Sequence, residues 1–163
     1  MIINKHKSEL YNILLTLSRN IFFYKNIKLP DNFETRLYLI FVHLSILMII
    51  YRNRDSKFNQ NLYDSLFHNI ENDQRELGFG DVTVNKKMKE FNKIFYDILL
   101  KINKSNMKSF EMNFKLISSY FMVFDGEKCP KYIEFSNYFS KFYKYCFGLP
   151  LDNMLSKLLN FKY

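Results

Sequence analysis

The chain of 163 residues is poor in cysteine and histidine, and this scarcity excludes most metal chemistry. Cys129 and Cys146 form no CxxC pair and have no histidine near them in sequence. The three histidines, His6, His43 and His68, are scattered. Neither a zinc-type ligand set nor a disulfide framework follows from this spacing. We therefore expect no metal and no cofactor, and two isolated cysteines are typical of a reducing compartment such as the cytoplasm.

A long uninterrupted apolar run is also missing. The most apolar stretch, Leu37 to Tyr51, has 15 residues and contains His43 and Ser45. A helix needs about 20 apolar residues to span a bilayer, so this stretch predicts a buried core helix. The N-terminus shows no apolar segment ending in small residues, as a secretory signal would. The expected location is the cytoplasm, with peripheral attachment to the inner membrane left open.

Glycine and proline are scarce too, with four and three residues, and they divide the chain into segments. Within each segment the apolar residues recur every three or four positions, which is typical of helices, and no segment alternates like a strand. After Pro30, Asp31 with Glu34 predicts a capping box. The expected helices are about 10–21, 31–52, 62–77, 81–102, 109–124, 132–147 and a short one after 151. The sequence thus predicts an all-α protein, residues 1–163 forming a single compact bundle of about six to seven helices.

Basic residues outnumber acidic ones, and the excess lies in the second half. Residues 1–80 carry 10 Lys and Arg against 8 Asp and Glu, whereas residues 81–163 carry 14 against 8. The absence of alanine and the preference for lysine over arginine indicate a genome biased against GC-rich codons, so charge alone is weak support for a polyanionic partner. Lys86, Lys87, Lys89 and Lys93 follow the glycine pair Gly78/Gly80 closely. We expect them to contact a partner, either an anionic membrane surface or ribosomal RNA.

The segment Gly78-Phe79-Gly80-Asp81 has the spacing of a dinucleotide-binding loop, but other features exclude that function. The third glycine is missing, the preceding segment is helical, and no Gly-Lys-Ser/Thr ending follows. The sequence shows no Ser–His–Asp or Cys–His arrangement and no HExxH motif. A DDxxD-type carboxylate cluster, as an enzyme acting on lipids or isoprenoids would need, is also absent. We expect no enzyme activity, no catalytic residue and no small-molecule substrate.

Polar residues near the apolar helix and the glycine pair are expected to be structural. His43 is predicted to be buried and bonded to a polar partner rather than to be a haem or metal ligand. Arg36 lies on the same helix, and a half-buried arginine needs a carboxylate, for which Glu76 and Asp81 are the candidates. Arg75, Glu76 and Asp81 are predicted to lock the glycine turn through ionic and capping bonds.

The chain resembles the ubiquinol–cytochrome c chaperone family, the all-helical assembly factors of the cytochrome bc1 complex. The match covers about residues 10–100, and its strongest part is Arg75-Glu76-Leu77-Gly78-Phe79-Gly80-Asp81. Gln74 departs from the leucine that is usual in the family, and residues 105–163 match little. The other matching pieces, in order, are Leu10-Tyr11, Phe23-Tyr24, Leu29-Pro30-Asp31, Arg36-Leu37, His43-Leu44, Gln60, Leu62-Tyr63-Asp64, Phe67, Asn69-Ile70-Glu71, Val84, Lys86-Lys87-Met88-Lys89 and Phe95-Tyr96.

This resemblance implies a non-enzymatic chaperone that assists newly made cytochrome b or other bc1 subunits. A basic helical module that binds RNA or the ribosome directly is the alternative. A chaperone of membrane proteins needs an apolar groove for helical segments. The Phe, Tyr and Met residues of 107–147 are the expected source of such a groove, although an ordinary core needs the same residues.

Overall fold

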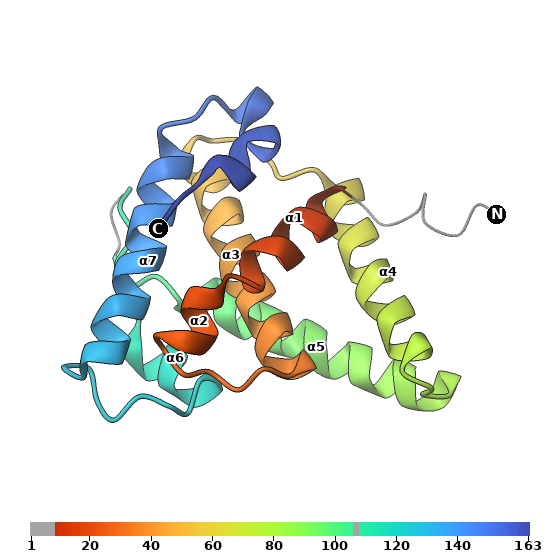
Figure 1. Ribbon diagram of the computed structural model, residues 1–163. Coiled ribbons are helices and arrows are strands. Elements are labelled where there is room, and N and C mark those ends of the chain that lie inside the picture. Colours follow the sequence, from red (N-terminus) through yellow and green to blue (C-terminus); the bar gives the residue numbers. More distant parts are fainter. Residues whose placement is uncertain (1–8, 106–107) are drawn as a thin grey trace.

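The structure is a computed structural model that describes residues 9–105 and 108–163. Over these ranges the chain forms seven α-helices and no strand, apart from one isolated β-bridge between Asn103 and Met112. The prediction of an all-α fold is confirmed (Figure 1). The elements are α1 (Glu9–Ser18), α2 (Ile21–Lys25), α3 (Phe33–Asn53), α4 (Gln60–Glu76), α5 (Asp81–Lys101), α6 (Phe114–Tyr120), α7 (Pro130–Phe147) and two 3₁₀ turns, η1 (Leu151–Asn153) and η2 (Leu155–Asn160).

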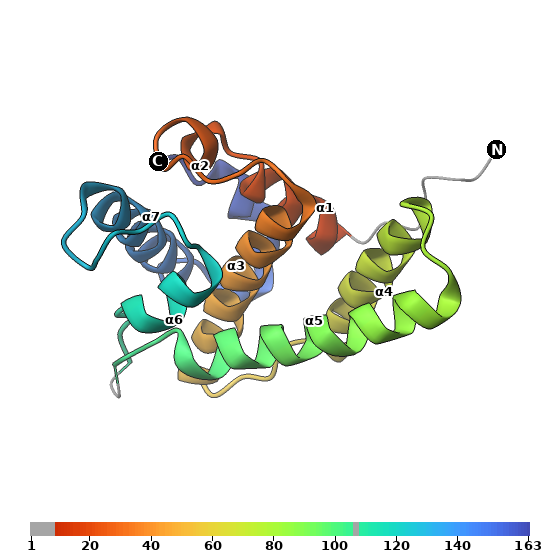
Figure 2. The ribbon, with the colours of Figure 1, turned by 90° about the horizontal axis from the view of Figure 1, so that it is seen from below.

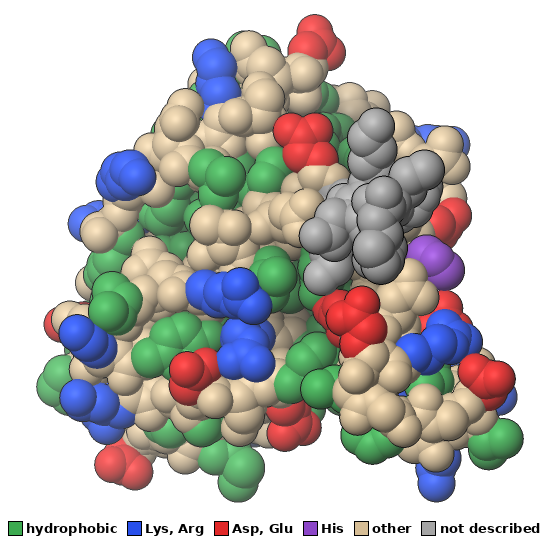
Figure 3. Space-filling model, turned by 45° about the vertical axis from the view of Figure 1, so that its right-hand side comes forward, with side chains coloured by type: hydrophobic (Ala, Val, Ile, Leu, Met, Phe, Trp, Pro, Cys, Tyr) green, Lys and Arg blue, Asp and Glu red, His purple; other side chains and the backbone are tan. Residues whose placement is uncertain are grey.

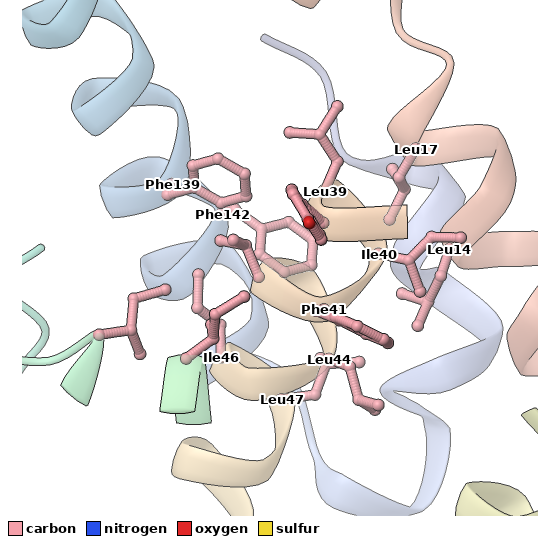
Figure 4. Packing of buried hydrophobic residues seen from close by; sticks show 14 of the residues in the cluster. Leu14, Leu17, Leu39, Ile40, Phe41, Leu44, Ile46, Leu47, Phe139 and Phe142 are labelled. Atoms are coloured by element: carbon pink, nitrogen blue, oxygen red, sulfur yellow. The ribbon is translucent and has the colours of Figure 1, made fainter. Parts of the chain in front are cut away.

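Helix α3 is the centre of the bundle, and α1, α5 and α7 pack around it. Its residues Leu39 to Leu47 are buried on every side, because each neighbouring helix presents an apolar face to it. Figure 4 shows Leu14 and Leu17 of α1 and Phe139 and Phe142 of α7 pointing toward this segment. Among the described helices, α3 alone is long and apolar enough to cross a bilayer, but 72% of its apolar window is buried in the bundle. Such burial is typical of a core helix.

Helix α3 does not begin with the predicted capping box. Asn32, not Asp31, is its N-cap, and the side-chain oxygen of Asn32 accepts a hydrogen bond from the backbone N–H of Thr35 at 2.9 Å. Glu34 instead accepts a hydrogen bond from the Tyr38 hydroxyl. Asn32 lies one residue nearer to the helix, where its side chain reaches the free N–H groups of the first turn.

Three other helix predictions need correction. The expected first helix is interrupted, because Asn20 caps a separate helix, α2, by accepting from the N–H of Phe22. The expected helix over 109–124 is only α6, because Asn113 caps its start and its backbone N–H bonds to Ile102 at 2.8 Å. The last segment forms the 3₁₀ turns η1 and η2 instead of an α-helix.

A buried histidine connects α3 with α7. Because a carbonyl only accepts, His43 Nδ1 donates to the backbone oxygen of Leu39 at 2.6 Å, and Nε2 accepts from the Tyr138 hydroxyl at 2.9 Å. Burial lowers the pKa of His43 from 6.5 to about 4, so the ring is neutral at pH 7. The prediction of a buried histidine with a polar partner is confirmed.

Candidate functional site: a groove beside the α4–α5 turn

The two glycines of the family motif have different roles in the turn between α4 and α5. Gly78 has φ of +95°, a conformation that side chains oppose. Its N–H bonds to Arg75 O at 2.9 Å and the next N–H, of Phe79, bonds to Gln74 O at 3.3 Å, which is the pattern of a Schellman motif. Gly80 has φ of −74° and is the N-cap of α5. The sharp reversal therefore depends on Gly78.

An arginine links the two helices across this turn. Arg75 Nε lies 3.3 Å from Asp81 Oδ1, and its terminal nitrogen lies 3.1 Å from Glu71 Oε1. The predicted ionic bond between Arg75 and Asp81 is confirmed. The capping role of Asp81 is wrong, because Asp81 is already the first helical residue after the N-cap Gly80. Glu76 forms no ion pair with another described residue and faces a hollow instead, and Glu71 takes the second bond.

A first hollow of about 370 Å³ lies between α1, α3 and α4. Its buried floor consists of Leu37, Ile40 and Ile70. Figure 3 shows it as a notch in this face of the molecule, with apolar side chains in its walls and charged ones at its margins. The other lining residues are Tyr11, Leu15, Arg19, Phe33, Arg36, Asp73, Glu76 and Leu77. A hollow with an apolar floor and a charged rim is suited to an apolar segment with polar flanks.

A second hollow of about 400 Å³ continues the first toward the turn. Phe33 and Leu77 line both, so the two form one continuous surface, which we call the groove. Phe79 lies at its outer end, with Lys87 Nζ 4.6 Å from the centre of the Phe79 ring. The remaining residues of the second hollow are Asn32, Glu34, Gln74 and Phe91.

The charged margins of the first hollow are of opposite sign on opposite walls. Arg19 and Arg36 belong to the α1 and α3 side, whereas Asp73 and Glu76 belong to α4. Arg36 pairs with Asp31 at 2.7 Å, so the prediction that Glu76 or Asp81 would be its partner is wrong. Asp31 is only five residues away and just before α3, within easy reach of the arginine.

One buried polar group of the groove lacks a partner. Gln74 is buried, lines the second hollow, and its Nε2 has no hydrogen-bond partner among the described residues. An unsatisfied buried amide costs about 1–3 kcal/mol. The cost falls at the position where the family resemblance predicts leucine.

In a comparison with protein-family models, the ubiquinol–cytochrome c chaperone model matches residues 25–113. This match covers more than half of the chain. The chain belongs to the ubiquinol–cytochrome c chaperone family. Comparisons with curated proteins and with solved structures gave no match.

The matched region of this chaperone contains α3, α4 and α5 and therefore most of the groove. The family motif supplies three groove residues, Glu76, Leu77 and Phe79. Tyr11, Leu15 and Arg19 of α1 precede the matched region, and the Tyr11 hydroxyl bonds to Asp73 of α4 across the first hollow. Burial, with Asp73 adding to it, raises the pKa of Tyr11 above its usual range. The family resemblance includes Tyr11, but nothing in the sequence predicts that α1 forms a wall of the groove.

The four lysines predicted to bind a partner do not share one surface in the chaperone. Lys86, Lys89 and Lys93 are exposed on the outer side of α5. Lys87 is half-buried and turns toward Phe79 in the groove. Any role of Lys87 therefore differs from that of the other three.

The groove was expected over residues 107–147, but no described residue of this range lines it. Residue 107 lies outside the described residues. The aromatic side chains of α7, including Phe135, Tyr138, Phe139 and Phe142, are buried in the core, where they pack on α2 and α3. An ordinary core thus accounts for them, and the groove of the chaperone is built from earlier segments. Across the described ranges no three His, Cys, Asp or Glu side chains gather where they could hold a metal.

Proposed function

We propose that this protein assists assembly of the cytochrome bc1 complex by holding an apolar helical segment of newly made cytochrome b in the groove. Membership of the family supports a chaperone role in bc1 assembly. That cytochrome b is the client, and that the groove is where it binds, goes beyond what family membership supports. These two parts of the proposal depend on the surface that the family motif forms.

The observation that carries the proposal is the apolar lining of the groove beside the motif. Leu77 and Phe79 are 59% and 39% exposed, although both are large apolar residues. They continue the buried floor of Leu37, Ile40 and Ile70 outward to the surface. An amphipathic or apolar helix laid along such a surface covers these side chains, which is the helix-in-groove mode of recognition.

The charged margins suit a segment taken from a membrane protein. Membrane helices are apolar along their length and carry polar or charged residues at their ends. Arg19 and Arg36 on one side and Asp73 and Glu76 on the other offer both signs to such ends. The amide of Gln74 offers one further hydrogen-bond donor to a polar group of the segment.

Holding a client requires no catalytic group. Of the described histidines, His43 is buried against α7 and His68 is exposed on α4, and neither lines the groove. We infer that the protein acts by covering apolar surface until cytochrome b reaches its place in the complex.

The experiment is a pull-down from detergent-solubilised membranes of cells that make cytochrome b. The tagged wild-type chain is expected to retain cytochrome b, and a Leu77→Ser/Phe79→Ser variant is expected to retain at least about 10-fold less, since two apolar contacts of about 1 kcal/mol each are lost. Ile21→Ser is the matched control, because Ile21 is 60% exposed on α2, outside the groove. Equal recovery of cytochrome b by all three chains would contradict the groove as the binding site. Recovery of no cytochrome b by any of the three chains would contradict cytochrome b as the client.

A further inference from the structure

The outer side of α5 carries a single line of exposed residues that the groove does not use. Their spacing of four, three, four, three and four residues places them on one face of the helix. We call this line the outer stripe. It consists of Val82, Lys86, Lys89, Lys93, Tyr96 and Leu100.

The outer stripe is opposite the face with which α5 packs on the bundle. The buried residues of the helix are Val84, Phe91, Phe95 and Ile98, about half a turn away from the stripe. Figure 2 shows α5 along one edge of the molecule, and none of the other described helices lies on its outer side. The stripe is therefore open to a large flat partner over its whole length, about 27 Å at 1.5 Å per residue.

Apolar residues occupy both ends of the stripe and are unusually exposed. Val82 is 84% exposed, Leu100 is 73% exposed, and Tyr96 beside Leu100 is 49% exposed. Between these ends lie only lysines, and all three are exposed. Amphipathic surfaces that bind at a bilayer have this combination of aliphatic and aromatic groups with lysines.

Acidic residues do not neutralise the stripe. Of the acidic residues on α5, Asp81 pairs with Arg75 and Asp97 pairs with Lys101 at 2.5 Å. Glu90 lies beside the stripe but forms no ion pair within the described ranges. The three stripe lysines likewise pair with no described residue, so their charge is available to an anionic partner.

We propose that the outer stripe docks the protein on an anionic phospholipid bilayer. The lysines contact lipid phosphates, Val82 and Leu100 enter the headgroup region, and Tyr96 lies at the interface. Valine and leucine offer neither a stacking face nor a hydrogen bond, so the ends of the stripe suit lipid better than RNA, whose bases stack on aromatic groups. Val82 is three residues from Phe79, so docking brings the outer end of the groove to the membrane surface.

Two tryptophan reporters test this directly, because the chain contains no tryptophan of its own. Leu100→Trp places the reporter in the stripe, and Ile21→Trp places it on α2, on the other side of the molecule from α5 (Figure 2). With vesicles of about one part phosphatidylglycerol to two parts phosphatidylcholine, at low salt, the emission of Leu100→Trp is expected to shift to shorter wavelength and that of Ile21→Trp is not. Pure phosphatidylcholine vesicles are expected to shift neither.

Charge variants of the full chain complete the test by vesicle sedimentation. Each lysine near an anionic surface adds about a fivefold gain in binding, so Lys86→Gln/Lys89→Gln/Lys93→Gln is expected to bind roughly 100-fold more weakly. The matched control, Lys128→Gln/Lys131→Gln/Lys144→Gln, removes the same charge from exposed lysines elsewhere. Its binding to vesicles is expected to weaken by less than about 10-fold.

Three results would overturn the proposal. They are no binding to anionic vesicles, equal weakening by the two triple variants, and a stripe-dependent binding to single-stranded RNA in the absence of vesicle binding. The assay contains no cytochrome b, so its failure would leave the proposed function standing, and the reverse also holds.

Discussion

Acid is expected to destabilise the protein through one residue, His43. The pKa of His43 is lowered from 6.5 to about 4 because the ring is fully buried, so the unfolded chain binds a proton more readily than the folded one between these values. Stability is therefore complete above about pH 7.5 and falls as the pH falls toward 4. The loss amounts to about 1.4 kcal/mol at pH 5.5 and about 2.6 kcal/mol at pH 4.5, with a limit of about 3.4 kcal/mol.

The assay is urea unfolding at pH 7.5, 6.5 and 5.5, followed by far-ultraviolet circular dichroism. This window lies above the ordinary pKa values of carboxylates, so it isolates histidine. His43→Phe is expected to lower the free energy of unfolding at every pH but to abolish the change between pH 7.5 and 5.5. His68→Gln is the matched control, since His68 is an exposed residue of α4, and it is expected to retain the wild-type change.

Two outcomes would refute this reasoning. A wild-type free energy of unfolding that is constant from pH 7.5 to 5.5 would show that His43 is not held neutral by burial. An unchanged pH dependence in His43→Phe would assign the effect to another group.

Further predictions concern the turn, the groove and the thiols. Gly78→Ala is expected to lower the free energy of unfolding by about 1–2 kcal/mol because of the positive φ, whereas Gly80→Ala is expected to change it by less than about 0.5 kcal/mol; equal effects in urea unfolding would contradict the assigned turn. Gln74→Leu is expected to raise the melting temperature, since it removes a buried unsatisfied amide worth about 1–3 kcal/mol, and a lower melting temperature would show that the amide is satisfied. Burial raises the pKa of Cys146 to about 12, so iodoacetamide is expected to label Cys129 alone in the folded protein, as peptide mass spectrometry can check.

The sequence predicts the long helices well because their apolar residues recur with a helical period. Val84, Phe91, Phe95 and Ile98 were spaced as one face of a helix, and all four are buried in α5. The same reasoning failed at Asn20, because the side chain of Asn20 caps a separate helix, α2, where the periodicity predicted one continuous helix. Helix ends depend on single hydrogen bonds, which periodicity does not reveal.

The groove was far less predictable than the helices. The family resemblance identifies its motif residues, but no pattern of residues predicts that α1 and α3 supply the opposite wall. Arg36 forms an ion pair with Asp31, which is nearby in sequence, whereas the Tyr11 hydroxyl donates a hydrogen bond to Asp73, sixty-two residues away. The apolar residues of 107–147 were expected to supply a groove, but the described aromatic residues of α7 form core instead. A core and an apolar groove require the same side chains, and only packing distinguishes them.

Photo-cross-linking in cells that make cytochrome b tests the central claim most directly. A photoreactive residue at position 77, in the groove, is compared with one at position 21, since Leu77 and Ile21 are equally exposed at 59% and 60%. We predict that position 77 cross-links to newly made cytochrome b and that position 21 does not. Cross-linking to cytochrome b at position 21 but not at position 77 would contradict the groove as the client-binding site.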